Sequence, residues 1–158
     1  ESANGDWPVE SVQTMARIAT ETEEQLKYET AVSKAKSHTP ATSGVISRAA
    51  CNAANELKAA AIVSSTKSGA TARRISQCRP ECPIVAVTPS EKVAKSLAFC
   101  FGVYPVVAED QNSTDAMMAN ATKIAVENGF ANSGDTVVIA AGLDQVGSTN
   151  LLKVSVVE

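Results

Sequence analysis

The chain is poor in the residues from which most catalytic centres are built. Its 158 residues include one histidine, His38, and only 4% aromatic residues. With that histidine in a polar hinge and no G-x-S-x-G motif, no serine–histidine–aspartate triad can be assembled. The motifs G-x-G-x-x-G and G-x-x-x-x-G-K-[ST], which mark dinucleotide and nucleoside triphosphate sites, are also absent. The sequence therefore predicts a binding protein without a catalytic constellation of its own.

Two further classes of protein are disfavoured by what is missing. No apolar run approaches the roughly 20 residues that a membrane helix needs, and no secretory signal is recognisable. The formal net charge is −3, which disfavours a general nucleic-acid-binding surface. We expect a cytoplasmic domain with neither a nucleic-acid nor a membrane partner.

The cysteines form no recognisable framework. Four are present, at positions 51, 78, 82 and 100. Cys78 and Cys82 have a spacing that suits metal ligation, but no second pair and no partner histidine follows them. Free thiols in a reducing compartment are therefore expected, with no metal site.

The hydrophobic spacing divides the chain into two parts. Val9, Val12, Met15 and Ile18 recur at helical spacing behind Pro8, which suits the first turn of a helix. Residues 21–36 are polar, and the segment 37–40 ends the pattern with a proline. We place a boundary there.

Beyond residue 41, helices and strands alternate. Helices are expected over 45–57, 70–78, 89–101 and 114–128, and apolar strands over 60–64, 83–88, 103–107, 136–140 and 151–157. Apolar strands separated by helices indicate a parallel sheet covered on both faces. The last strand follows too short a loop for a crossover, so it should be antiparallel and lie at an edge. The expected fold is an α/β three-layer sandwich: a five-stranded, mostly parallel sheet with an antiparallel last edge strand and helices on both faces.

Capping residues predict where some of these helices begin and end. The run Thr88-Pro89-Ser90-Glu91 resembles a capping box with proline at the first helical position. Asn112 or Ser113 is expected to cap the next helix, and glycines at 102 and 129 should follow the two helix ends.

The stretch from Ile62 to Arg74 carries the strongest functional signal. An apolar strand runs into a loop of hydroxyls, one lysine and one glycine, and a helix then begins. The free N–H groups and the positive dipole end of that helix favour an anion. No acid lies between Glu56 and Glu81, whereas five basic residues do, at positions 58, 67, 73, 74 and 79. The alternative is a plain strand-to-helix turn with hydroxyl caps.

A second loop, from Gly142 to Asn150, also leaves the carboxyl end of a strand. In parallel sheets, loops at the carboxyl ends of neighbouring strands share one crevice, where ligands bind. The sequence therefore predicts a phosphate-binding site made by both loops, with these residues: Ser65, Thr66, Lys67, Ser68, Gly69, Thr71, Ser148 and Thr149.

Five motifs together resemble the carboxyl-terminal part of pyruvate kinase. They are GDWPVESV at 5–12, STKSGATAR at 65–73, RP-x-x-PIVAVT at 79–88, GVYP at 102–105 and TNLLKV at 149–154. The resemblance covers essentially the whole chain. It implies that residues 1–37 are the last helix of a catalytic α/β barrel with a linker, and that residues 38–158 are the carboxyl-terminal regulatory domain.

In this family the amino-terminal barrel carries catalysis and holds magnesium, potassium, phosphoenolpyruvate and nucleotide. The resemblance therefore implies a parent glycolytic phosphotransferase that acts on phosphoenolpyruvate and ADP. It assigns no catalytic residue and no cofactor to the present chain, whose first partner would be the barrel of the same polypeptide.

The resemblance also implies regulation and assembly. The family's effector site uses the loop matched by Ser64 to Thr71 and the late loop, and the effectors include fructose bisphosphate, sugar monophosphates and AMP. Relatives are homotetramers in which final strands pair edge to edge, so the strand from Leu151 to Val157 is expected to mediate a homo-oligomer.

Two other functions stay open from the residues alone. One is a free-standing phosphometabolite-binding protein or enzyme on the same fold, which would need an acid–base pair beside Lys67. Only folding would bring Asp144 there. The other is a structural oligomerisation module whose pocket no longer binds a ligand.

Overall fold

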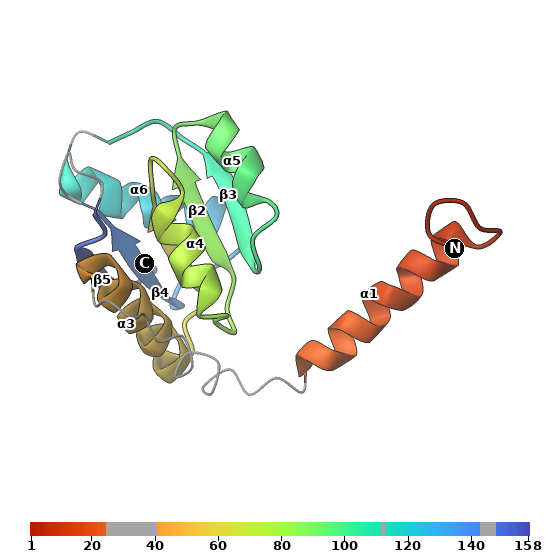
Figure 1. Cartoon of the computed structure of the whole chain (residues 1–158). Coiled ribbons are helices and arrows are strands. Elements are labelled where there is room, and N and C mark those ends of the chain that lie inside the picture. Colours follow the sequence, from red (N-terminus) through yellow and green to blue (C-terminus); the bar gives the residue numbers. More distant parts are fainter. Residues whose placement is uncertain (25–40, 112, 143–147) are drawn as a thin grey trace.

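The computed structural model describes residues 1–24, 41–111, 113–142 and 148–158, and its helices and strands follow the predicted order (Figure 1). The helices are α1 (Pro8–Glu24), α3 (Thr42–Leu57), α4 (Ala70–Gln77), α5 (Glu91–Leu97) and α6 (Thr114–Glu127). The strands are β1 (Ala61–Ser65), β2 (Ile84–Thr88), β3 (Val103–Val107), β4 (Thr136–Ala141) and β5 (Leu151–Val156).

The five strands form one sheet in the order β3-β2-β1-β4-β5. The strands β1 to β4 are mutually parallel, and β5 pairs antiparallel with β4 at the edge. The predicted fold class is therefore confirmed, including the direction and edge position of the last strand.

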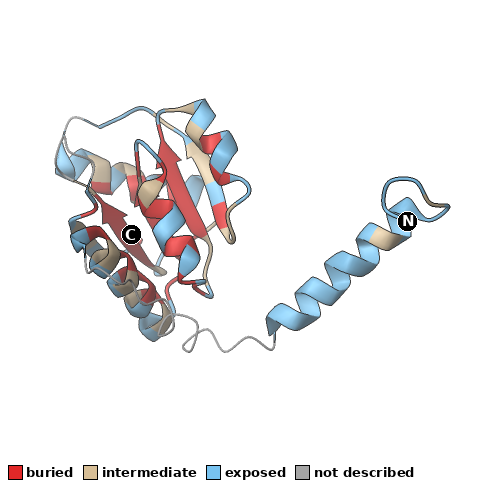
Figure 2. Cartoon of the chain, in the orientation of Figure 1, coloured by how far each residue is buried: buried red, intermediate tan, exposed pale blue. Residues whose placement is uncertain are grey.

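Helices cover both faces of the sheet, so the core has two halves. On one face, side chains of α3, α4 and α5 pack on Ile62, Ile84 and Val138. On the other face, α6 packs on Val63 and Ile139. Successive residues of β1 and of β4 thus point to opposite cores, as the twofold period of a strand requires. Figure 2 shows the resulting band of buried residues through the sheet.

The order of the strands reverses beside β1, which makes a topological switch point between β1 and β4. From β1 the chain moves outward through β2 to β3 and then returns through α6 to β4, on the other side of β1. Ser65 and Ala141, the last residues of β1 and β4, are register partners. Open α/β sheets bind ligands in the crevice at such a point. Both predicted loops leave the sheet at this edge.

The start of α5 differs from the predicted capping box. Its N-cap is Ser90, whose hydroxyl accepts from the Val93 N–H at 3.3 Å, while Thr88 accepts from the Ser90 N–H. Thr88 is fully buried as the last residue of β2 and precedes a proline, which favours extended backbone. The helix also ends at Leu97, four residues earlier than expected.

The start of α6 agrees with one of the two predicted caps. The Ser113 hydroxyl accepts from the Ala116 N–H at 3.2 Å. Asn112, the alternative cap, lies outside the described residues.

The amino-terminal helix α1 begins at Pro8 as predicted and has no buried residue (Figure 2). Its apolar residues Val9, Val12, Met15 and Ile18 are each more than half exposed. The expected continuation of this helix, the boundary at 37–40 and His38 fall outside the described residues. In the described part of the chain, no helix combines the length and the apolar character that crossing a bilayer requires.

Candidate functional site

The loop after β1 is held tightly by its own side chains. The Thr66 N–H donates to the Val87 carbonyl at 2.9 Å, which extends the β1–β2 ladder by one residue. The Gly69 N–H then donates to the Thr66 hydroxyl at 3.0 Å. Because that hydroxyl accepts here, its own proton remains able to donate to a ligand.

Gly69 turns the chain into α4 in a conformation that favours glycine. Its φ is +81°, and a Cβ at this position would lie 3.2 Å from side-chain carbons of Val93 and Leu97. The loop can therefore pass close to α5 only because Gly69 has no side chain.

The first turn of α4 has no side-chain cap. Gly69 is its N-cap and accepts no hydrogen bond through a side chain, whereas Ser90 and Ser113 cap α5 and α6. The N–H groups of Ala70 and Thr71 belong to the turn that lacks intrahelical acceptors. The amino end of α4 thus offers donors and a partial positive charge to an anion.

The late loop meets the first loop through two buried hydroxyls. The Oγ1 atoms of Thr71 and Thr149 lie 2.6 Å apart, and the residues are 5% and 1% exposed. Whichever hydroxyl donates, the other keeps its proton for a further acceptor. The predicted convergence of the two loops is therefore observed.

The absence of a side chain at Gly142 allows Ser148 to lie against the end of β4. A Cβ on Gly142 would lie 2.6 Å from the Ser148 carbonyl oxygen, which no other residue type could accommodate without movement of the backbone. Ser148 itself is exposed. Asp144, the acid considered for the enzyme alternative, lies outside the described residues.

Lys67 projects from the first loop and pairs with Asp110. Its Nζ lies 2.5 Å from Asp110 Oδ2, and the two side chains are 76% and 53% exposed. Asp110 follows β3, two strands away from β1 in the sheet. This contact was not predicted. The sequence does contain a signal for this contact. Two acidic residues at 109–110 closely follow a parallel strand, and the carboxyl ends of parallel strands share one edge of the sheet.

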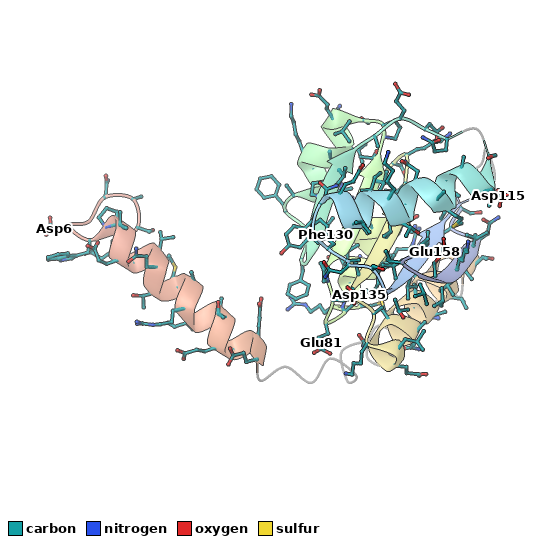
Figure 3. The ribbon with its side chains drawn as sticks, turned by 180° about the vertical axis from the view of Figure 1, so that it is seen from behind. Asp6, Glu81, Asp115, Phe130, Asp135 and Glu158 are labelled. Atoms are coloured by element: carbon teal, nitrogen blue, oxygen red, sulfur yellow. The ribbon has the colours of Figure 1, made fainter. Side chains whose placement is uncertain are left out.

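The other basic residues near the loop in sequence point elsewhere. Arg73 donates to the Ser96 hydroxyl of α5 at 2.8 Å. Lys58 pairs with Glu81 at 3.6 Å, at the end of the domain where β1 and β2 begin. Figure 3 shows Glu81 there, away from Asp115 in the first turn of α6. The positive charge that is clustered in the sequence is thus spread along the domain and does not gather at the loop.

The structure places the eight predicted residues in three environments. Thr66, Gly69, Thr71 and Thr149 are buried at the junction of the loops. Ser65 is half-buried as the last residue of β1. Lys67, Ser68 and Ser148 are exposed around them, where a ligand has access.

The cysteines lie away from this junction. All four are free thiols. Within the described ranges, no three histidine, cysteine, aspartate or glutamate side chains gather closely enough to hold a metal ion.

Comparison with known proteins identifies the family. The family described as "Pyruvate kinase, alpha/beta domain" matches residues 44–155. The chain belongs to the pyruvate kinase family. A pyruvate kinase of Clostridium acetobutylicum is 46% identical over 161 residues, which span 100% of this chain and 34% of the relative. The pyruvate kinase of Bacillus licheniformis is 40% identical and is covered over 27% of its length.

A solved pyruvate kinase has the same fold. The crystal structure of the Cryptosporidium parvum enzyme superposes with a TM-score of 0.86 at 28% identity, over 100% of this chain and 32% of that one. The resemblance to the carboxyl-terminal part of pyruvate kinase is confirmed. The chain spans about a third of the length of the pyruvate kinases it matches.

Proposed function

We propose that the chain is the regulatory and assembly part of a pyruvate kinase, and that the junction of its two loops binds the phosphate group of an allosteric effector. The parent enzyme transfers a phosphoryl group from phosphoenolpyruvate to ADP in glycolysis, in the cytoplasm. Residues 1–37 belong to the catalytic barrel and linker, and residues 38–158 form the regulatory domain. The remainder of the barrel, which this chain does not include, holds magnesium and potassium.

One observation carries the effector proposal. The hydrogen bond between Thr71 and Thr149 joins the uncapped amino end of α4 to the late loop. Amide donors and a hydroxyl pair thereby meet at the carboxyl edge of the sheet. Lys67 leaves the same loop on an exposed side chain whose ammonium is paired with Asp110, and it supplies the positive charge. Phosphate is the group that such an arrangement suits best, because it accepts several hydrogen bonds and carries the complementary charge.

Calorimetric titration tests this proposal. Fructose 1,6-bisphosphate, glucose 6-phosphate and AMP are titrated into the 158-residue chain and into its Lys67→Ala variant. Because a hydrogen bond to a charged group contributes about 1.5–3 kcal/mol, we expect at least a roughly 10-fold loss of affinity in the variant. Lys95→Ala, which removes the same charge from α5, is the matched control and should bind normally.

Each other outcome favours one alternative. If none of the three ligands binds, the proposal is contradicted, and the structural oligomerisation module is the remaining function. Turnover of a ligand by the chain alone would favour the free-standing enzyme.

Two exposed surfaces support the assembly role. The apolar stripe of α1, through Val12, Met15 and Ile18, has no buried residue, which suits a helix whose partner is the barrel of the same polypeptide. The strand β5 is an edge strand with exposed Val154 and Val156. Unpaired strand edges favour pairing with another chain, so we assign to β5 the contact between subunits of a homotetramer.

A further inference from the structure

Lys67, the one cation of the proposed phosphate site, already has an anionic partner. Its ammonium lies 2.5 Å from a carboxylate oxygen of Asp110. A phosphate group that binds Lys67 therefore competes with a group of the same charge sign that the chain itself supplies.

The backbone explains why these two residues meet. The Thr66 N–H donates to the Val87 carbonyl at 2.9 Å, and the Ala108 N–H donates to the Thr88 carbonyl at 3.1 Å. Lys67 and Asp110 thus follow the last ladder bonds on the two sides of β2. Neighbouring strands lie about 4.8 Å apart, so the two backbones are separated by roughly 10 Å, which the long lysine side chain bridges together with the carboxylate.

The segment that carries Asp110 is ordered locally and acidic. Gln111 Nε2 donates to the Glu109 carbonyl at 3.2 Å, so a hydrogen bond spans Asp110. The side chains of Lys67 and Asp110 remain 76% and 53% exposed. An ion pair with this exposure is weak and exchangeable, so a doubly charged phosphate can displace it.

We infer that Asp110 is an internal competitor for the effector's phosphate. In the ligand-free chain it holds the Lys67 ammonium, and it is released when a phosphate takes its place. The inference rests on the proposed function, because it requires a phosphate at Lys67. Asp110 therefore lowers the affinity of the loop for phosphate. Its release also breaks the ion pair that connects the β3–α6 segment to the β1–α4 loop.

The test uses inorganic phosphate as the probe. It is titrated into the 158-residue chain while NMR follows the backbone amides of Ser68 and Gly69. The variant Asp110→Asn should bind phosphate roughly 2- to 5-fold more tightly, which is the range expected for the loss of an exposed ion pair. The control Glu109→Gln removes the same charge from the adjacent position and should change the dissociation constant by less than about 1.5-fold.

A double variant shows whether Asp110 acts through Lys67. In a Lys67→Ala background, Asp110→Asn should leave phosphate binding nearly unchanged, because there is no longer an ammonium group for which Asp110 and phosphate compete. If Asp110→Asn binds no more tightly than the wild type, or if Glu109→Gln has an equal effect, this inference is overturned while phosphate binding at the loop stands. If the amides of Ser68 and Gly69 respond to phosphate in no variant, the proposed function is overturned, and this inference with it.

Discussion

Thr71 and Thr149 are 78 positions apart in the sequence, yet their hydroxyl oxygens lie 2.6 Å from each other. Thr71 belongs to the first turn of α4, and Thr149 lies two residues before β5. Both side chains are buried, so neither hydroxyl can exchange its partner for bulk water. This contact joins the first turn of α4 to the segment before β5 at the carboxyl edge of the sheet.

Loss of one of these hydroxyls should destabilise the domain more than loss of both. Thr71→Val leaves the Thr149 hydroxyl buried without its partner, which costs about 1–3 kcal/mol of unfolding free energy. The double variant with Thr149→Val replaces both partners by apolar groups of similar shape and should recover most of that loss. Urea denaturation of the wild type, the two single variants and the double variant measures the coupling. Additive effects would contradict a direct interaction.

Two glycines should respond in opposite directions to the same substitution. Gly69→Ala places a Cβ at φ +81° and 3.2 Å from side chains of α5, and we expect a loss of about 1–2 kcal/mol. Gly44 lies in helix α3, where a Cβ would meet only the flexible Arg48 side chain at 3.7 Å. Gly44→Ala should therefore stabilise the domain by about 0.5–1 kcal/mol. Thermal unfolding of both variants checks the two signs.

The fold was largely predictable from the sequence because its determinants are local. The strands β1, β2 and β4 are largely apolar runs, and Gly69, Ser90, Ser113 and Gly129 mark helix ends. Helix α5 was an exception, because it starts later and ends earlier than predicted. Thr88 has the composition of an N-cap, but burial in the sheet keeps it in β2, and Ser90 takes the capping role. Burial in the sheet thus determines which of the two hydroxyl residues is the N-cap of α5.

The meeting of the two loops was predictable from the sequence, and the pairing of the charged side chains was not. The topology of a parallel sheet brings the two loops to one edge, as the contact between Thr71 and Thr149 shows. Whether a basic side chain also lies where the loops meet depends on the direction in which that side chain leaves the backbone. Arg73 turns to Ser96, and Lys67 reaches across β2 to Asp110. A sequence gives the spacing of such residues but not the reach of their side chains.

The stability of the domain should fall in alkaline solution because of Cys82. Burial raises the pKa of the Cys82 thiol to about 11, whereas the pKa of a cysteine in an unfolded chain is about 8.5. The folded state therefore favours the neutral thiol. Its contribution is fully present below about pH 8.5 and is lost as pH rises toward about 11, by up to about 3 kcal/mol.

Cys82→Ser provides the control for this pH dependence, because serine does not titrate in that range. Urea denaturation under reducing conditions, from pH 7 to pH 11, gives the unfolding free energy of both proteins. Above about pH 8.5, the unfolding free energy of the wild type should fall relative to that of the variant. A difference that stays constant over this range would show that the thiol is not shielded from ionisation.

The edge strand β5 offers a defined row of backbone groups for assembly. The Val157 N–H donates to the Asp135 carbonyl at 2.9 Å, which fixes the phase of the β4–β5 ladder. Because hydrogen-bonded and non-bonded pairs alternate in an antiparallel ladder, Val154, opposite Val138, directs its backbone N–H and carbonyl groups toward the free edge. Proline at Val154 therefore removes a donor of the free edge without removing a bond to β4.

We expect the 158-residue chain to dimerise through this edge and Val154→Pro to weaken the dimer at least roughly 10-fold, since the proline removes a hydrogen bond and adds a ring in the path of the partner strand. Sedimentation equilibrium across a range of concentrations measures the dissociation constant. Ser155→Pro is the informative comparison, because Ser155 bonds inward to Val137 and its replacement should lower the melting temperature instead. A wild-type chain that remains monomeric at high concentration, or a dimer that Val154→Pro leaves intact, would exclude β5 as the contact and leave the exposed stripe of α1 as the next surface to test.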